Sequence, residues 1–124
     1  MKSTLLVMIG GAVGAALRFQ LARLLPATAG GWPWATFLAN FAGGFAMGML
    51  AAWLLKAGSH GETMRLLLGV GVLGGFTTFS AFSLEMAQMI ERGSIGLALG
   101  YAVSSVLLAL IGLFAGMAIM KATI

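Results

Sequence analysis

The chain has 124 residues, of which 60% are hydrophobic and 8% charged, whereas about a quarter of the residues in an ordinary soluble domain are charged. Its mean hydropathy is +1.05, and since a spanning helix needs roughly 20 apolar residues, the length holds about four spans and leaves little for a soluble domain. The net charge of +4 comes from scattered basic residues without a basic stripe, which argues against a nucleic-acid-binding face, and the lack of cysteine excludes thiol catalysis and thiolate metal sites. We therefore predict an all-α integral membrane protein, with residues 1–124 forming one membrane domain.

The first predicted helix spans about residues 4–25. It follows Met1-Lys2-Ser3, an N-terminus that imitates a signal peptide, but no clear small-residue cleavage motif follows the apolar run, so we expect the helix to be retained. Arg18 lies where this helix should still be near the membrane, and its side chain either snorkels to the headgroups or lines an entrance vestibule that attracts anions. The loop that follows is marked by Pro26, Gly30, Gly31 and Pro33.

The second predicted helix spans about residues 34–55 and carries Asn40 among apolar residues. An unpaired amide inside a membrane costs up to several kcal/mol, so Asn40 must have a partner. Either the amide hydrogen-bonds another helix as a structural contact, or its NH₂ group faces a pore and donates to an anion. Both interpretations remain open from the sequence.

The third predicted helix spans about residues 64–90 and contains the segment Gly74-Gly-Phe-Thr-Thr-Phe-Ser-Ala-Phe-Ser83. Two adjacent glycines and four hydroxyl residues interrupt an otherwise apolar span there, which predicts a break in the helix at residues 74–78. Unwound backbone at membrane depth is tolerated only where it is buried in protein or lines a wet cavity, and its carbonyl groups can bind a cation.

Three further side chains of the third helix are candidates for a function. Phe79 and Phe82 are three residues apart on one helical face, and their electropositive ring edges are able to attract an anion, although phenylalanines at this spacing more often pack against another helix. Glu85 is an ionisable group that costs about 3 kcal/mol at the middle of a bilayer, which makes it a functional candidate by default. The alternative for Glu85 is a vestibule carboxylate paired with an arginine.

The fourth predicted helix spans about residues 95–120 and carries the hydroxyl groups of Tyr101, Ser104 and Ser105. Serine in membrane helices often hydrogen-bonds its own backbone, so these hydroxyls alone assign no function. Every predicted helix also carries glycines four residues apart, which allow close helix contacts. This pattern favours an oligomer, although the same ridges also suit contacts within one chain. The pairs are Gly10/Gly14, Gly44/Gly48, Gly71/Gly75, Gly96/Gly100 and Gly112/Gly116.

The basic residues divide almost evenly between the two ends of the predicted helices. One end collects Lys2, Lys56, Arg65 and Lys121, and the other collects Arg92, Arg23 and, nearer the membrane, Arg18. Because the distribution of Lys and Arg normally fixes how a membrane protein inserts, an even division favours insertion in both orientations. The alternative is a weak bias that still decides one orientation in the cell.

Catalysis has little support in this chain. The single histidine, His60, lies in a loop rich in glycine and serine, and the only acidic residues are Glu62, Glu85 and Glu91. No nucleophile has a neighbouring base, and no group of residues has metal-ligand spacing. We therefore expect a protein that is not an enzyme.

Three segments together resemble the Fluc (CrcB) fluoride channel family over essentially the full length of the chain. They are Gly10-Gly-Ala-Val-Gly-Ala-Ala-Leu-Arg18, Ala35-Thr-Phe-Leu-Ala-Asn-Phe-Ala-Gly-Gly44 and Gly74-Gly-Phe-Thr-Thr-Phe-Ser-Ala-Phe-Ser83. The resemblance implies a passive, fluoride-selective channel that exports cytoplasmic fluoride across the cell inner (plasma) membrane and reduces its toxicity. It also implies an antiparallel, dual-topology homodimer with two pores.

The same resemblance implies roles for particular residues. The fluoride pore would be lined by Asn40, Phe79, Phe82, Ser105, Tyr101 and Thr36, with Arg18 and Glu85 at the vestibule or near the pathway. The carbonyl groups of Gly74 and Thr77 from both subunits would bind a structural sodium ion at the centre of the dimer, and a hard cation suits carbonyl ligands.

Two other functions remain as alternatives. Small proton-coupled multidrug transporters also have four helices, but they carry a carboxylate in the first helix, whereas this chain has none before Glu62. A membrane assembly subunit that transports nothing would use the glycine ridges to hold a partner. Fluoride flux that is independent of protons distinguishes a channel from both.

Overall fold

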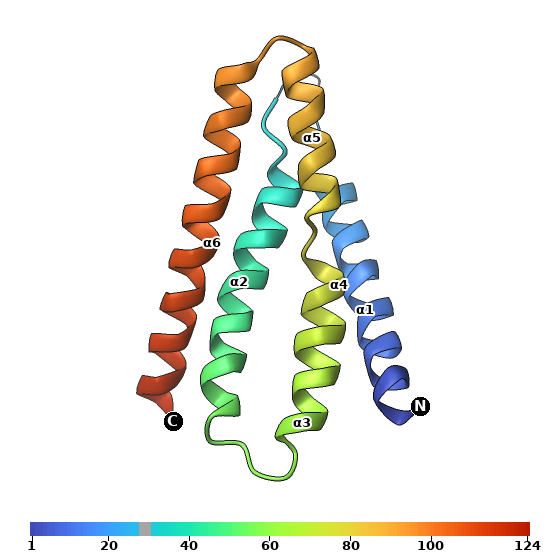
Figure 1. The fold of residues 1–124 in the computed structure, drawn as a ribbon, viewed down its shortest axis with the longest axis vertical. Coiled ribbons are helices and arrows are strands. Elements are labelled where there is room, and N and C mark those ends of the chain that lie inside the picture. The colour runs from blue at the N-terminus through green and yellow to red at the C-terminus, as the bar shows by residue number, and fades with distance from the viewer. Residues whose placement is uncertain (28–30) are drawn as a thin grey trace.

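The computed structural model describes residues 1–27 and 31–124, and within these residues the regular structure is entirely helical (Figure 1). The described part contains four helices that are long and apolar enough to cross a membrane, as the hydropathy predicts: Lys2–Leu24, Trp34–Leu54, Gly61–Glu91 and Ile95–Thr123. Gly30 of the predicted first loop lies outside the described residues.

The four spans consist of seven helical segments. They are α1 (Lys2–Leu24), α2 (Trp34–Leu54), α3 (Gly61–Met64), the wider π-helix η1 (Arg65–Leu73), α4 (Gly74–Phe76), α5 (Ser80–Glu91) and α6 (Ile95–Thr123). The third span begins at Gly61 instead of residue 64, and Glu62 pairs with Arg65 at 2.8 Å within its first turn. The fourth span continues to Thr123 instead of residue 120, and the Thr123 hydroxyl donates to the carbonyl of Ile119.

The third span loses its helical conformation for three residues near its middle. Gly74–Phe76 is helical, Thr77 has an extended backbone with φ −82° and ψ 156°, and Ser80 is the first residue of α5. The non-helical residues are thus 77–79, whereas the sequence pattern placed the break at residues 74–78. In a membrane every backbone polar group needs a partner, so glycine alone does not open a helix. The helix opens where side chains offer other partners.

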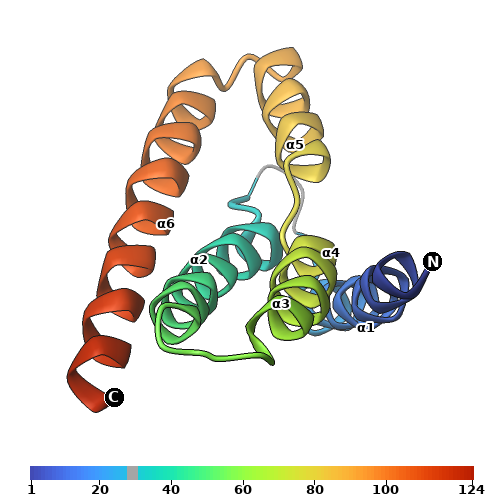
Figure 2. The ribbon, with the colours of Figure 1, turned by 60° about the horizontal axis from the view of Figure 1, so that its bottom comes forward.

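Glycines bring the spans together in two pairs, with α1 beside η1 and α4 and with α2 beside α6 (Figure 2). Gly14 on α1 faces the backbone carbonyl of Val72, and Gly48 on α2 faces that of Leu113 on α6, so closely that a Cβ atom at either position would overlap the oxygen. Four of the five predicted glycine ridges pack within the chain in this way. Among the glycines of these ridges, only Gly96 and Gly100 have no neighbouring atom within 4 Å of where a Cβ atom would lie.

Both chain termini lie at the same end of the molecule as the connection between α2 and α3, whereas α5 and α6 are joined at the opposite end (Figure 1). Lys56 at the first end donates a hydrogen bond to the carbonyl oxygen of Ile124, at 3.1 Å. The core lies toward the opposite end, where Tyr101 and Met89 are fully buried and pack with Phe82 and Ala98. This core supports one side of the site described next.

Candidate functional site

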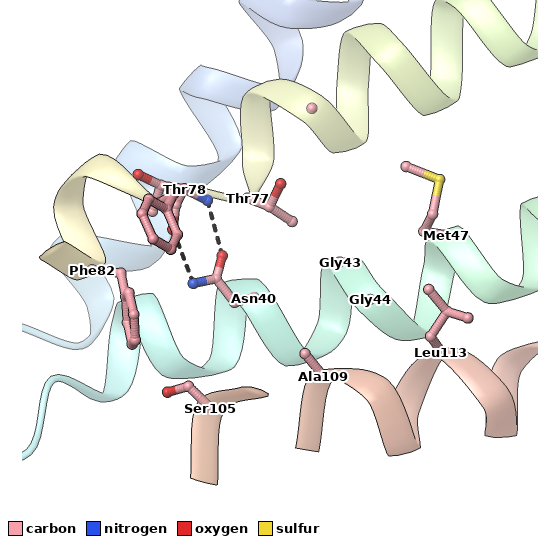
Figure 3. A pocket seen from close by; sticks show the side chains of 12 residues that line it. Asn40, Gly43, Gly44, Met47, Thr77, Thr78, Phe82, Ser105, Ala109 and Leu113 are labelled. Atoms are coloured by element: carbon pink, nitrogen blue, oxygen red, sulfur yellow. Dashed lines mark hydrogen bonds between the residues drawn. The ribbon is translucent and has the colours of Figure 1, made fainter. Parts of the chain in front are cut away.

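An open groove of about 520 Å³ lies between α2, α6 and the non-helical residues 77–79 (Figure 3). Most of its lining is apolar with a few polar groups, a composition that is common among small-molecule binding sites. The groove is lined by Asn40, Gly43, Gly44, Met47, Gly74, Thr77, Thr78, Phe79, Phe82, Ser105, Ala109 and Leu113.

Asn40 joins α2 to the non-helical segment through two hydrogen bonds (Figure 3). Its Nδ2 group donates to the backbone carbonyl of Thr78 at 3.0 Å, and its Oδ1 atom accepts from the backbone N–H of Thr78 at 2.9 Å. Asn40 thus makes a hydrogen-bonded contact with another span, which was one of the two roles that the sequence allowed for it. Since an amide nitrogen carries two hydrogens, one N–H of Asn40 remains for a second acceptor in the groove.

The two phenylalanine side chains line the same groove but differ in packing. Their ring centroids lie 5.8 Å apart, with the ring planes at 43°. Phe82 is 8% exposed and packs on Tyr101, with ring centroids 5.0 Å apart, whereas Phe79 is 79% exposed. The sequence pattern placed both residues on one helical face, but Phe79 precedes the first residue of α5. One ring is therefore fixed by the core, and the other stands at the open side.

Glu85 lies three residues after Phe82 on α5, and two hydroxyl groups from two other helices donate to its carboxylate. Thr36 on α2 donates to Oε2 at 2.7 Å, and Tyr101 on α6 donates to Oε1 at 2.8 Å. Within residues 1–27 and 31–124 no arginine pairs with this carboxylate. The alternative of an arginine-paired Glu85 was therefore wrong for this part of the chain, and the carboxylate instead connects α2, α5 and α6.

Replacing Tyr101 by phenylalanine is expected to destabilise the protein by about 1–3 kcal/mol, because a partly buried carboxylate loses one of its two donors. Unfolding in detergent, followed by circular dichroism, measures this change. Ser104→Ala is the control, because the Ser104 hydroxyl donates only to backbone carbonyls of its own helix, those of Gly100 and Tyr101. Equal stability of Tyr101→Phe and the parent protein would show that the contact with Glu85 does not hold the three helices together.

Ser105 offers a hydroxyl group to the groove. The residue is 9% exposed, and its Oγ atom has no hydrogen-bond partner among the described residues. Its neighbour Ser104 bonds its own helix, as is common for serine in membrane helices. A buried hydroxyl without a partner costs about 1–3 kcal/mol, so the Ser105 position is stabilised by any ligand that accepts its proton.

Arg18 lies apart from the groove. Its Nε group is 3.4 Å from the backbone carbonyl oxygen of Gly75, so it contacts the third span from α1. Gly74 and Thr77, whose carbonyl groups were implied as cation ligands, do line the groove. The structure thus brings together Asn40, Phe79, Phe82, Ser105, Gly74 and Thr77. Thr36, Glu85 and Tyr101 do not line the groove, but they are hydrogen-bonded to one another and adjoin it through the contact of Tyr101 with Phe82. Arg18 contacts the third span from α1.

The sequence reasoning missed the roles of three residues beside the groove. The Thr78 hydroxyl accepts a hydrogen bond from the backbone N–H of Ala81 at 3.1 Å, and Gly43 leaves room for the Thr77 side chain. Trp32 packs edge-on against Tyr101, with ring centroids 5.3 Å apart. Threonine often accepts a hydrogen bond from a backbone N–H in the first turn of a helix, as Thr78 does from Ala81 at the start of α5. The role of Thr78 could therefore have been predicted from the sequence. The other two contacts join distant segments and had no such signal.

Comparisons with known proteins agree on one family. The family model described as "CrcB-like protein, Camphor Resistance (CrcB)" matches residues 5–117. Similar proteins named "Fluoride-specific ion channel FluC" come from Novosphingobium aromaticivorans, 55% identical over 124 residues and covering 98% of each chain, and from Phenylobacterium zucineum, 56% identical over 119 residues and covering 94% of each. Another protein of that name, from Caulobacter vibrioides, is 50% identical over 123 residues, which cover 98% of this chain and 97% of the relative.

Proposed function

The chain belongs to the CrcB family, and from that membership we propose that it is a fluoride-selective channel, which lets fluoride leave the cytoplasm passively and so reduces its toxicity. The chain is a channel and not an enzyme. Fluoride enters a cell as the weak acid HF and ionises in the cytoplasm, so a selective pore for the anion is sufficient for export and no energy source is required.

One observation carries the assignment of the pathway to the groove, namely the buried Ser105 hydroxyl that has no partner within the described residues. Near it the groove also offers the spare N–H of Asn40 and the ring edges of Phe79 and Phe82. A small anion gives up its water only where other donors replace it, and neutral donors let it leave again. These groups together supply weak, successive contacts without a full positive charge.

We also assign supporting positions to the residues behind the groove. Thr36 and Tyr101 keep the Glu85 carboxylate satisfied, so that it contributes to the polar side of the pathway without an arginine partner. Arg18 acts at the vestibule, where a positive charge raises the local concentration of anions.

The functional unit in this proposal is an antiparallel, dual-topology homodimer in the cell inner membrane. The almost even division of basic residues between the two ends supports both orientations. The groove supports a second copy, since it is open on one side and Phe79 is 79% exposed there. Within this dimer the carbonyl groups of Gly74 and Thr77 would hold a structural sodium ion, and they fit it, because both residues line the open groove and carbonyl oxygens suit hard cations.

Flux from liposomes tests the function directly. The purified protein is placed in vesicles loaded with potassium fluoride or potassium chloride, and a fluoride or chloride electrode follows release after a potassium ionophore is added. We expect rapid release of fluoride without release of chloride and without dependence on a proton gradient. Release that requires a proton gradient would favour a coupled transporter, and silence from well-folded protein would favour an assembly subunit.

A further inference from the structure

Two backbone N–H groups at the break in the third span bond side chains instead of the helix. In an α-helix the N–H of each residue bonds the carbonyl four residues earlier, so Thr78 would bond Gly74, and Ala81 would bond Thr77. Here the N–H of Thr78 donates to Oδ1 of Asn40 at 2.9 Å, and the N–H of Ala81 donates to Oγ1 of Thr78 at 3.1 Å. Both helical bonds are thereby replaced.

The carbonyl groups released by this exchange belong to Gly74 and Thr77. Among residues 1–27 and 31–124 neither carbonyl oxygen accepts a hydrogen bond from the backbone or from a side chain. Both residues line the open groove. An unsatisfied carbonyl inside a bilayer costs several kcal/mol, so the two groups require a partner from outside the chain.

We infer that Asn40 and Thr78 are positioning residues, whose side-chain oxygens take the two N–H groups that would otherwise close over Gly74 and Thr77 and so leave both carbonyl groups available to a hard monovalent cation. The inference rests on the proposed dimer, in which the cation lies between two copies. It gives Asn40 a second function besides donating to the anion, and it assigns Thr78 a function through its side chain.

The neighbouring turn of α2 supports the same arrangement. Gly43 lies one turn after Asn40, and a Cβ atom there would overlap the Cγ2 atom of Thr77. The absence of a side chain at Gly43 thus lets the extended Thr77 lie directly against α2, while Asn40 holds the next residue. Asn40 and Gly43 on α2 therefore both favour the extended backbone at the break.

Thr78→Val tests the inference, because valine keeps the shape of threonine but has no oxygen to accept the Ala81 N–H. The melting temperature of the full-length protein in detergent is measured while sodium chloride replaces choline chloride, with potassium chloride as a parallel series. A cation that binds the folded protein raises this temperature. We expect Thr78→Val to need roughly tenfold more sodium for half of the rise, since the freed Ala81 N–H then competes for the Thr77 carbonyl.

Three further variants complete the experiment. Asn40→Ala is expected to raise the sodium requirement by a similar factor, whereas Thr78→Ser, which keeps the hydroxyl, is expected to match the parent protein. Thr123→Val is the matched control, since the Thr123 hydroxyl only bonds its own helix. If Asn40→Ala does not fold, Thr78→Val decides the question alone.

A sodium requirement in Thr78→Val equal to that of the parent would overturn the inference, and so would a parent protein whose stability does not respond to sodium. Both outcomes leave fluoride flux untouched, because flux is measured separately in vesicles. Conversely, a protein that conducts no fluoride but shows the expected sodium shifts would refute the proposed channel and retain the role of Asn40 and Thr78.

Discussion

Phe79→Ile protein is expected to fold normally but to release fluoride on the order of a hundredfold more slowly than the parent. A hundredfold loss corresponds to about 2.7 kcal/mol of lost stabilisation along the pathway. Isoleucine keeps the apolar volume but has no electropositive ring edge to offer an anion. Because the Phe79 side chain is 79% exposed, its replacement disturbs few contacts within the chain. Vesicle release with a fluoride electrode measures the rate, and circular dichroism checks the fold.

Phe82→Ile extends the same prediction to the buried ring. It should also slow release, but with some loss of stability, because Phe82 packs on Tyr101. Phe19→Ile on α1 is the control, since that side chain is 60% exposed and does not line the groove. Parent-like release by both Phe79→Ile and Phe82→Ile would show that the pathway lies elsewhere.

The second large effect is expected at the glycines between helices. Gly48→Ala should destabilise the protein by about 1–3 kcal/mol, because the new methyl group overlaps the backbone carbonyl of Leu113, which cannot rotate away. Gly14→Ala should have a similar effect, because its methyl group overlaps the carbonyl of Val72. Reversible unfolding in mixed detergent micelles measures both changes.

Gly100→Ala is the matched control for these substitutions. It also lies within a membrane helix, but no atom of another described segment lies within 4 Å of the new methyl group. Alanine has the higher helix propensity, so this variant should be as stable as the parent or slightly more stable. A loss at Gly100 as large as that at Gly48 would mean that the close contacts between α2 and α6 are not the source of the effect.

The four spans were predictable from the sequence, because a run of about 20 apolar residues has few other structures available to it. The position of the break was predicted less well. Adjacent glycines pointed to residues 74–78, but the non-helical residues are 77–79. The position of the break depends on two side-chain acceptors, Asn40 on another helix and Thr78 at the break itself. Only Thr78 belongs to the local sequence of the third span, so a local pattern does not include the contribution of Asn40.

The partners of the candidate site residues were harder to predict than their identities. Asn40, Phe82 and Ser105 were all marked by polarity or spacing, and the structure brings them to one groove. For Glu85 the sequence offered a functional role or, as the alternative, an arginine partner, whereas two hydroxyl groups from distant segments donate to the carboxylate. The glycine ridges showed the same limit, because spacing reveals that a surface permits close contact but not which helix makes it.

The glycine contacts between helices also bear on how such chains diverge over evolution. Gly14, Gly48 and Gly116 face backbone oxygens of neighbouring spans, so any side chain at these positions displaces a helix. The outward residues of α6, such as Leu99, are exposed and need only remain apolar. Substitutions should therefore accumulate quickly on the outward faces and slowly along the glycine contacts. Related chains are then expected to differ in the composition of their outward faces while the spacing between their helices stays the same.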